Sequence, residues 1–219
     1  MSRKFFFIMM LCMSGLPFLA QAQTVTINSN ASFASDGTFT LSGAATAFND
    51  LVVNPAIGKL GATAPEWVDF NTTFSALAFD AARDEFVTFT IQMPHDYKEG
   101  SDIYAHVHWT SQTAAGTNRV TWKLDYAWAN LSSALTTTGN LSASEITTGA
   151  AHSMIAYEHV ITPLGTISGT GKTLSSIITC RLTRVGSGGS DSYGADADLL
   201  SFDLHYEADA FGSSSEYTK

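Results

Sequence analysis

The sequence predicts an all-β fold, specifically an antiparallel β-sandwich, and two observations carry this prediction. From Thr24 onward apolar and polar residues alternate with a period close to two, as in strands that bury one face. Turn residues separate the runs, and helical spacing is rare. About eight such runs favour a jelly roll, and an immunoglobulin-like sandwich is the alternative.

The composition bounds the size of the domain and its partners. The 219 residues are 45% hydrophobic and 11% aromatic, which is enough for a core and excludes disorder. Eleven Lys and Arg stand against 20 Asp and Glu, for a net charge of -9. This acidic balance argues against binding of a nucleic-acid backbone and against adsorption to an anionic membrane.

Residues 1–22 are predicted to be a signal peptide. Arg3 and Lys4 precede an apolar run over 5–13, and Ala20-Gln21-Ala22 supplies a small-residue cleavage signal. The run is shorter than the ~20 residues of a membrane-spanning helix, and an uncleaved anchor is the alternative. We expect a secreted protein, extracellular or periplasmic, with no membrane association after cleavage.

Cleavage would leave Cys180 as the single cysteine, so no intrachain disulfide is expected. Cys180 lies within an alternating run, where a small buried hydrophobe is the prediction. A nucleophilic thiol is the sharper alternative, but no activating partner is near it in the sequence.

Two regions follow the signal peptide. Residues 23–65 are rich in Ser, Gly, Asn and Ala, and predict an extended N-terminal arm or early strands, with short strands at 24–27 and 38–41. Residues 66–219 are predicted to form the sandwich, and 74–79 is ambiguous between strand and helix. Six longer runs are predicted strands: 85–93, 101–110, 118–130, 154–161, 175–185 and 198–208. Their apolar faces predict the core: Phe89, Ile91, Val107, Trp109, Trp122, Leu124, Tyr126, Phe202 and Leu204.

Three histidines form the candidate metal site. His106 and His108 stand two apart in a strand, so both side chains point to one face, about 6–7 Å apart. Two neutral imidazoles can share zinc or iron if a third ligand is near, and His205 on the polar face of the last strand could supply it. The alternative is a polar ladder beside Asp203. A divalent metal is the one cofactor that these residues could hold.

The spacing of Gly100 before His106 matches the opening of a cupin motif. The glutamate that a cupin places after the histidine pair is missing, because residues 109–116 contain no acid.

Other motifs favour structural interpretations. The segment 169–173 reads Gly-Thr-Gly-Lys-Thr but has Thr166 where a phosphate loop needs glycine, so a hairpin loop is expected. Residues 186–194 predict a mobile hairpin tip. The nearby acids could hold calcium, but a solvated acidic segment is the prediction. These acids are Asp191, Asp196, Asp198 and Asp203.

Aromatic residues in turns are candidates for sugar binding. Trp67, Tyr97 and Tyr193 lie in predicted turns, and we expect them to be exposed.

Several segments together resemble a known family. They are Pro94-His95-Asp96-Tyr97-Lys98-Glu99-Gly100, His106-Val107-His108-Trp109, Leu124-Asp125-Tyr126-Ala127-Trp128, Cys180-Arg181-Leu182 and Ser201-Phe202-Asp203-Leu204-His205-Tyr206. The series is similar to a poorly characterised family of tailed-phage and metagenomic viral genomes. The resemblance implies a phage-related virion structural protein. This sequence departs from it by its signal peptide, because tailed-phage virions assemble in the cytoplasm.

The expected function is that of an exported, non-enzymatic structural or surface-interaction protein. It would self-assemble through its jelly roll into a homo-oligomer, a trimer by analogy, with the arm crossing to a neighbour. The first alternative is a carbohydrate-binding sandwich with a surface glycan as partner. The second is a cupin-like metal-dependent enzyme.

Overall fold

The computed structural model describes residues 25–35, 37–114, 117–145 and 154–219. The predicted signal peptide, residues 1–22, lies outside the described residues and stays a prediction. Within the described part of the chain, no helix is long and apolar enough to cross a membrane.

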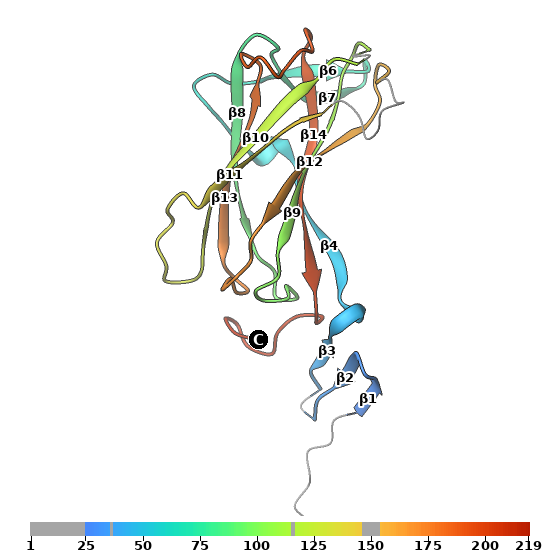
Figure 1. The fold of residues 1–219 in the computed structure, drawn as a ribbon, viewed down its shortest axis with the longest axis vertical. Coiled ribbons are helices and arrows are strands. Elements are labelled where there is room, and N and C mark those ends of the chain that lie inside the picture. The colour runs from blue at the N-terminus through green and yellow to red at the C-terminus, as the bar shows by residue number, and fades with distance from the viewer. Residues whose placement is uncertain (1–24, 36, 115–116, 146–153) are drawn as a thin grey trace, which may run out of the picture.

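Two antiparallel sheets pack face to face as a sandwich (Figure 1). The first, called the β9–β14 sheet, contains β4 (Ala47–Val53), β6 (Glu66–Phe70), β7 (Phe74–Phe79), β9 (Ile103–Thr110), β12 (Val160–Ile167) and β14 (Ala197–Ala208). The second, called the β10–β13 sheet, contains β5 (Lys59–Leu60), β8 (Asp84–Gln92), β10 (Val120–Ala129), β11 (Gly139–Glu145) and β13 (Ile177–Val185). The ambiguous segment 74–79 is therefore a strand.

The winding of these strands is that of a jelly roll. One sheet has the order β12-β9-β14-β7 and the other β11-β10-β13-β8. Successive strands from β7 to β10 alternate between the sheets, and β14 returns to lie between β7 and β9. Two interlocked Greek keys of this kind define a jelly roll and not an immunoglobulin sandwich. The predicted fold class is confirmed.

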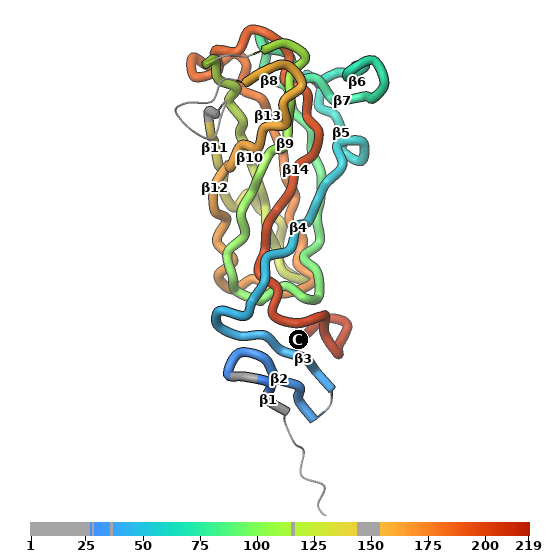
Figure 2. Tube along the Cα trace, turned by 90° about the vertical axis from the view of Figure 1, so that its right-hand side faces the viewer, coloured from blue at the N-terminus to red at the C-terminus, as the bar shows by residue number. Residues whose placement is uncertain are grey.

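Residues 25–65 contribute β4 and β5 to the two sheets of the sandwich and also form a small sheet of their own. β4 pairs with the second part of β14, from Phe202 to Ala208, while β7 pairs with the first part of β14. Upstream, β1 (Val25–Asn28), β2 (Ala31–Phe33) and β3 (Phe39–Leu41) form a separate small sheet below the sandwich (Figure 2). Phe39 stacks on Phe211 of the C-terminal tail, with ring centroids 4.6 Å apart. The described residues also include two 3-10 helices, Gly43–Ala45 and Pro55–Ile57.

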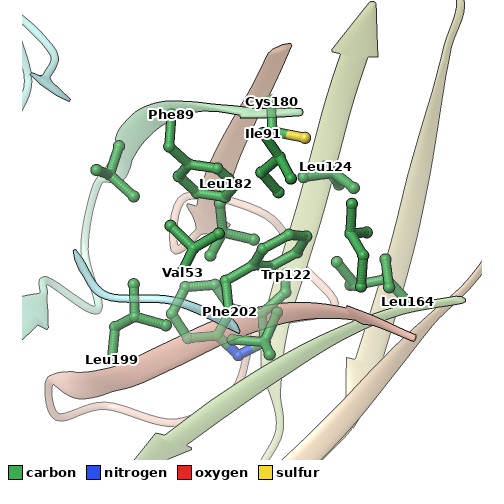
Figure 3. Packing of buried hydrophobic residues seen from close by; sticks show 14 of the residues in the cluster. Val53, Phe89, Ile91, Trp122, Leu124, Leu164, Cys180, Leu182, Leu199 and Phe202 are labelled. Carbon is green, nitrogen blue, oxygen red and sulfur yellow. The ribbon is translucent and has the colours of Figure 1, made fainter. Parts of the chain in front are cut away.

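The core lies between the two sheets, as the alternating faces predict. Trp109 and Trp122 are fully buried, and Phe79 meets Trp122 edge to face at 5.1 Å. Of the predicted core residues, Tyr126 alone is half-buried. Cys180 is buried among apolar neighbours (Figure 3), and burial raises the pKa of its thiol to about 12. The thiol is therefore not activated as a nucleophile.

The predicted strand at 154–161 is wrong in its bounds, since the strand runs from Val160 to Ile167. It includes Pro163 and Gly165, two residue types that are uncommon inside strands. β12 lies at the edge of its sheet, and its register with β9 shifts between Pro163 and Gly165. An edge strand with a bulge tolerates a proline that has no N–H to donate.

The predicted faces of the last strand are wrong at its start, because β14 contains a second bulge. The alternation places Leu199 on the outer face, with Ser201 and Asp203. The register with β9 shifts between Leu199 and Ser201, so Leu199 points into the core (Figure 3). The extra residue restores Phe202 to the inner face and Asp203 to the outer one.

A buried ion pair holds the glycine-rich segment 186–194 at Asp191, while Ser187, Gly189 and Ser190 are exposed at its tip. Arg184 and Asp191 have fully desolvated side chains and make two hydrogen bonds, both of 3.0 Å. Asp198 and Asp203 are buried as well, so the predicted solvated acidic segment is wrong for three of its four members. Asp196 alone is exposed.

Candidate functional site

The structure brings the three predicted histidines together on the outer face of the β9–β14 sheet. β9 and β14 are antiparallel neighbours, with His106 opposite Asp203 and Tyr104 opposite His205. His108 lies opposite Ser201, one row away. Because outward positions alternate along both strands, His106, His108 and His205 surround the carboxylate of Asp203.

Asp203 is the centre of the group. His106 Nδ1 lies 3.2 Å from its Oδ1, and His108 Nε2 lies 2.9 Å from its Oδ2. His205 Nε2 is 3.4 Å from the same Oδ2. The carboxylate is almost fully covered, whereas the His205 side chain remains 37% exposed. The group therefore opens toward solvent on the His205 side.

The environment keeps Asp203 ionised. Its burial alone would raise the pKa of the carboxyl, but the hydrogen bonds from His106 and His108 outweigh it. The charge of His108 and His205 adds to this effect, so the pKa of Asp203 lies well below its usual range. A buried carboxylate is thus available as a negative ligand at neutral pH.

Two further side chains join the group. His159 Nε2 lies 2.8 Å from His108 Nδ1, and the two rings stack with centroids 5.1 Å apart. Burial, and then the proximity of His108, lower the pKa of His159. Asp50 of β4 places its Oδ1 3.2 Å from His205 Nε2. We call His106, His108, His159, His205, Asp50 and Asp203 the histidine cluster.

Sequence spacing identifies only part of this cluster. His106 and His108 share a face by simple alternation, and Asp203 is foreseen only as part of a polar ladder. His159 and Asp50 have no sequence signal, because the pairing of β12 with β9 and of β4 with β14 brings them in. The compact subset is His106, Asp203 and His205, whose ligand atoms all lie within 4.8 Å of one another.

A second candidate site is a groove on the outer face of the β10–β13 sheet. It has a volume of about 450 Å³. We call it the threonine groove and define it by six of its lining residues: Thr88, Asp125, Ala127, Thr137, Thr179 and Arg181. The strand register sets Thr88, Arg181 and Asp125 in one row across β8, β13 and β10.

An ion pair compensates the charge of Asp125 in this groove, whereas Arg181 keeps its positive charge. Lys123 Nζ contacts Asp125 Oδ1 at 2.9 Å, and the Arg181 guanidinium lies 3.7 Å from the centre of the Phe86 ring. The neighbouring row carries Thr90 and Thr179, whose hydroxyls are 3.3 Å apart. The groove thus presents hydroxyl, carboxylate and guanidinium groups at strand spacing without a large net charge.

The predicted sugar-binding aromatics do not form a platform. Trp67 is exposed, but it lies on β6 of the other sheet. Tyr97 and Tyr193 are buried, so the expectation of exposure is wrong for both. Each phenol O–H donates to a backbone carbonyl. Tyr97 donates to that of Ser101 at 2.5 Å, and Tyr193 donates to that of Thr113 at 2.9 Å. Burial raises the pKa of Tyr97 to about 12.

The phosphate-loop-like segment connects β12 of one sheet to β13 of the other, so the loop is confirmed but the predicted hairpin is wrong. Lys172 donates to the carbonyl of Trp128 at 2.6 Å and is not free for a phosphate. Gly169 packs closely against the backbone of Ser101.

Comparisons with known proteins identify no family. No protein-family model matches the chain, and no curated protein matches it. Among solved structures, the chain is similar to TmCBM61, a carbohydrate-binding module solved in complex with beta-1,4-galactotriose. The identity is 10%, the match covers 72% of this chain and 86% of that chain, and the TM-score is 0.35.

Proposed function

We propose that this chain is a non-enzymatic surface-interaction protein whose jelly roll binds a neutral glycan in the threonine groove. The observation that carries the proposal is the row of Thr88, Arg181 and Asp125 across three strands. Strands lie about 4.8 Å apart, so a chain of sugar rings crossing them meets a polar group at regular intervals.

The donor and acceptor types fit sugar hydroxyls. A hydroxyl both donates and accepts, so it can donate to Asp125 and accept from Arg181, and the threonine hydroxyls serve either role. Among the groove residues, Asp125 is compensated by its pair with Lys123, and Arg181 keeps its single positive charge while it stacks on the Phe86 ring. A neutral, hydroxyl-rich ligand therefore suits this groove better than a phosphate polymer does.

A groove without a stacking aromatic platform binds weakly. Each hydrogen bond contributes only about 0.5–1.5 kcal/mol net, because the ligand gives up bonds to water. Assembly of several copies would compensate, since linked sites raise avidity by about 10²–10⁴-fold. The homo-oligomer expected from the sequence is thus part of the proposal, and light scattering on the purified chain tests it. A monomer at high micromolar concentration would contradict assembly.

The glycan proposal is tested on a glycan array, followed by titration with the best oligosaccharide. We expect Arg181→Ala and Asp125→Ala each to weaken binding by about tenfold or more, the equivalent of one charge-assisted hydrogen bond. Thr166→Ala is the matched control, because Thr166 is exposed on β12 of the opposite sheet. Equal binding by all three variants, or no glycan bound by the unaltered protein, would contradict the proposal.

A further inference from the structure

We infer that the histidine cluster is a binding site for one divalent transition-metal ion of the zinc class, ligated by His106, Asp203 and His205. This site lies on the β9–β14 sheet, whereas the threonine groove lies on the other one. The inference goes beyond the glycan proposal and does not depend on it.

The geometry already approaches that of a metal site. Zinc binds imidazole nitrogen at 2.0–2.1 Å and carboxylate oxygen at 2.0–2.2 Å, so the ligand atoms of a tetrahedral site lie about 3.3–3.5 Å apart. Asp203 Oδ1 lies 3.2 Å from His106 Nδ1, and the other oxygen, Oδ2, lies 3.4 Å from His205 Nε2. One ligand atom from each of the three residues lies within 4.8 Å of the other two. Small side-chain rotations would bring the three groups around one ion.

The backbone supports this arrangement. The two histidines come from different strands, and the pairing of β9 with β14 holds those strands in register over most of their length. The bulge between Leu199 and Ser201 sets the outward position of Asp203. The ligands are therefore placed by a rigid sheet and not by a loop.

The ligand types select the metal. Two imidazole nitrogens and one carboxylate oxygen suit zinc, copper or nickel, while calcium and magnesium prefer sites made of oxygen alone. Three protein ligands leave a fourth position, and the exposed His205 side of the cluster faces solvent. Asp50, 3.2 Å from His205 Nε2, adds negative charge at this opening.

His108 is a positioning residue in this site. Its Nε2 lies 2.9 Å from Asp203 Oδ2, on the carboxylate oxygen that does not face His106. Its Nδ1 is in turn 2.8 Å from His159 Nε2. Such outer partners orient metal-binding carboxylates, and their loss typically weakens metal affinity by about 10–100-fold.

The alternative is a purely structural network in which the histidines only satisfy a buried carboxylate. Both interpretations predict that Asp203 matters for folding, so stability alone cannot separate them. Metal affinity and the spectrum of bound metal can, because a structural network has neither.

The experiment uses the full chain purified without an affinity tag and freed of metal by dialysis against a chelator. Calorimetric titration with Zn²⁺ should give one ion per chain. Titration with Co²⁺ should give visible absorption typical of a four-coordinate site with nitrogen and oxygen ligands. His205→Ala and His106→Ala should each weaken Zn²⁺ binding at least 10–100-fold, and His108→Ala should weaken it within that range.

The matched control is His95→Ala. His95 bonds Ser213 and Ser175 and lies outside the histidine cluster, so Zn²⁺ binding should be unchanged. His205 is partly exposed, and its variant should fold even if the His106 variant does not. Circular dichroism verifies the fold of each variant.

Three results would overturn the inference: no Zn²⁺ bound at about 100 μM, full affinity retained in His205→Ala, or an equal loss in His95→Ala. None of these assays contains a glycan, so their failure is distinct from failure of the proposed function.

Discussion

Replacement of Arg184 by methionine tests how the glycine-rich segment 186–194 is held in place. Arg184 is fully buried and uses every guanidinium N–H. Nε and Nη2 donate to the two oxygens of Asp191, both at 3.0 Å. Nη1 donates to the carbonyls of Phe79 and Ala195, both at 2.8 Å, and Nη2 also donates to that of Tyr193 at 2.7 Å.

The magnitude follows from what the substitution leaves behind. Methionine fills a similar volume but has no donor, so three carbonyls and a buried carboxylate lose their partner. Asp191 would keep only the backbone N–H groups of Thr121 at 3.0 Å and Tyr193 at 3.3 Å. Removal of one partner from a buried ion pair costs about 3–5 kcal/mol, because the other charge stays desolvated.

Urea denaturation followed by circular dichroism measures the loss in the free energy of unfolding. The matched control is Lys123→Met, which breaks the partly exposed pair with Asp125. Pairs of that kind contribute about 0–1 kcal/mol. A loss below about 1 kcal/mol for Arg184→Met, or one equal to that of the control, would refute the reasoning.

Three further substitutions test the core, the pH dependence and a close backbone contact. Trp122→Ala should lower the free energy of unfolding by about 3–5 kcal/mol in urea, and a loss below about 1 kcal/mol would mean that its face is exposed. Burial, opposed only in part by a hydrogen bond from Gln112, raises the pKa of Asp198 from 3.8 to about 6. The folded state therefore binds the proton of Asp198 more tightly than the unfolded state does. Stability should fall as pH rises from about 4 to about 6. Asp198→Asn should abolish this fall and add about 1–3 kcal/mol at pH 7, whereas an unchanged pH profile in urea titrations would contradict it. Gly169→Ala would set a Cβ 1.7 Å from the Ser101 carbonyl oxygen, so thermal melting should show a loss of about 1–3 kcal/mol, and an unchanged midpoint would contradict this contact.

Alternation along the chain was sufficient for the sandwich and most of its core. A period of two places every second residue of β8, β9 and β10 inward, and the burial of Phe89, Val107 and Trp122 follows directly. The bounds of β12 did not follow, because Pro163 is tolerated only at a sheet edge, and edge position is a property of the whole sheet. The sequence pattern does not reveal the bulge at 199–201 either. One extra residue there exchanges the inner and outer faces of β14 without changing its composition.

The candidate sites show the same limit. Alternation puts His106 and His108 on one face, but the contact with Asp203 and His205 depends on which strand lies beside β9. Asp191 falls in a glycine-rich segment that suggests mobility, yet its partner Arg184 is fixed inside the fold. Long-range pairing, which a single sequence does not encode locally, decides these contacts.

The placement of β14 has a consequence for how the newly synthesised chain folds. β14, the last strand of the sandwich along the chain, lies in the middle of its sheet. β9 pairs with one side of it, and β4 and β7 pair with successive parts of the other side. A nascent chain that lacks it exposes unpaired edges on both sides, which invites aggregation. The late closure of such distant contacts makes folding slow. His106 and His205 meet only at that last step, so capture of a metal ion would mark a chain that has finished folding.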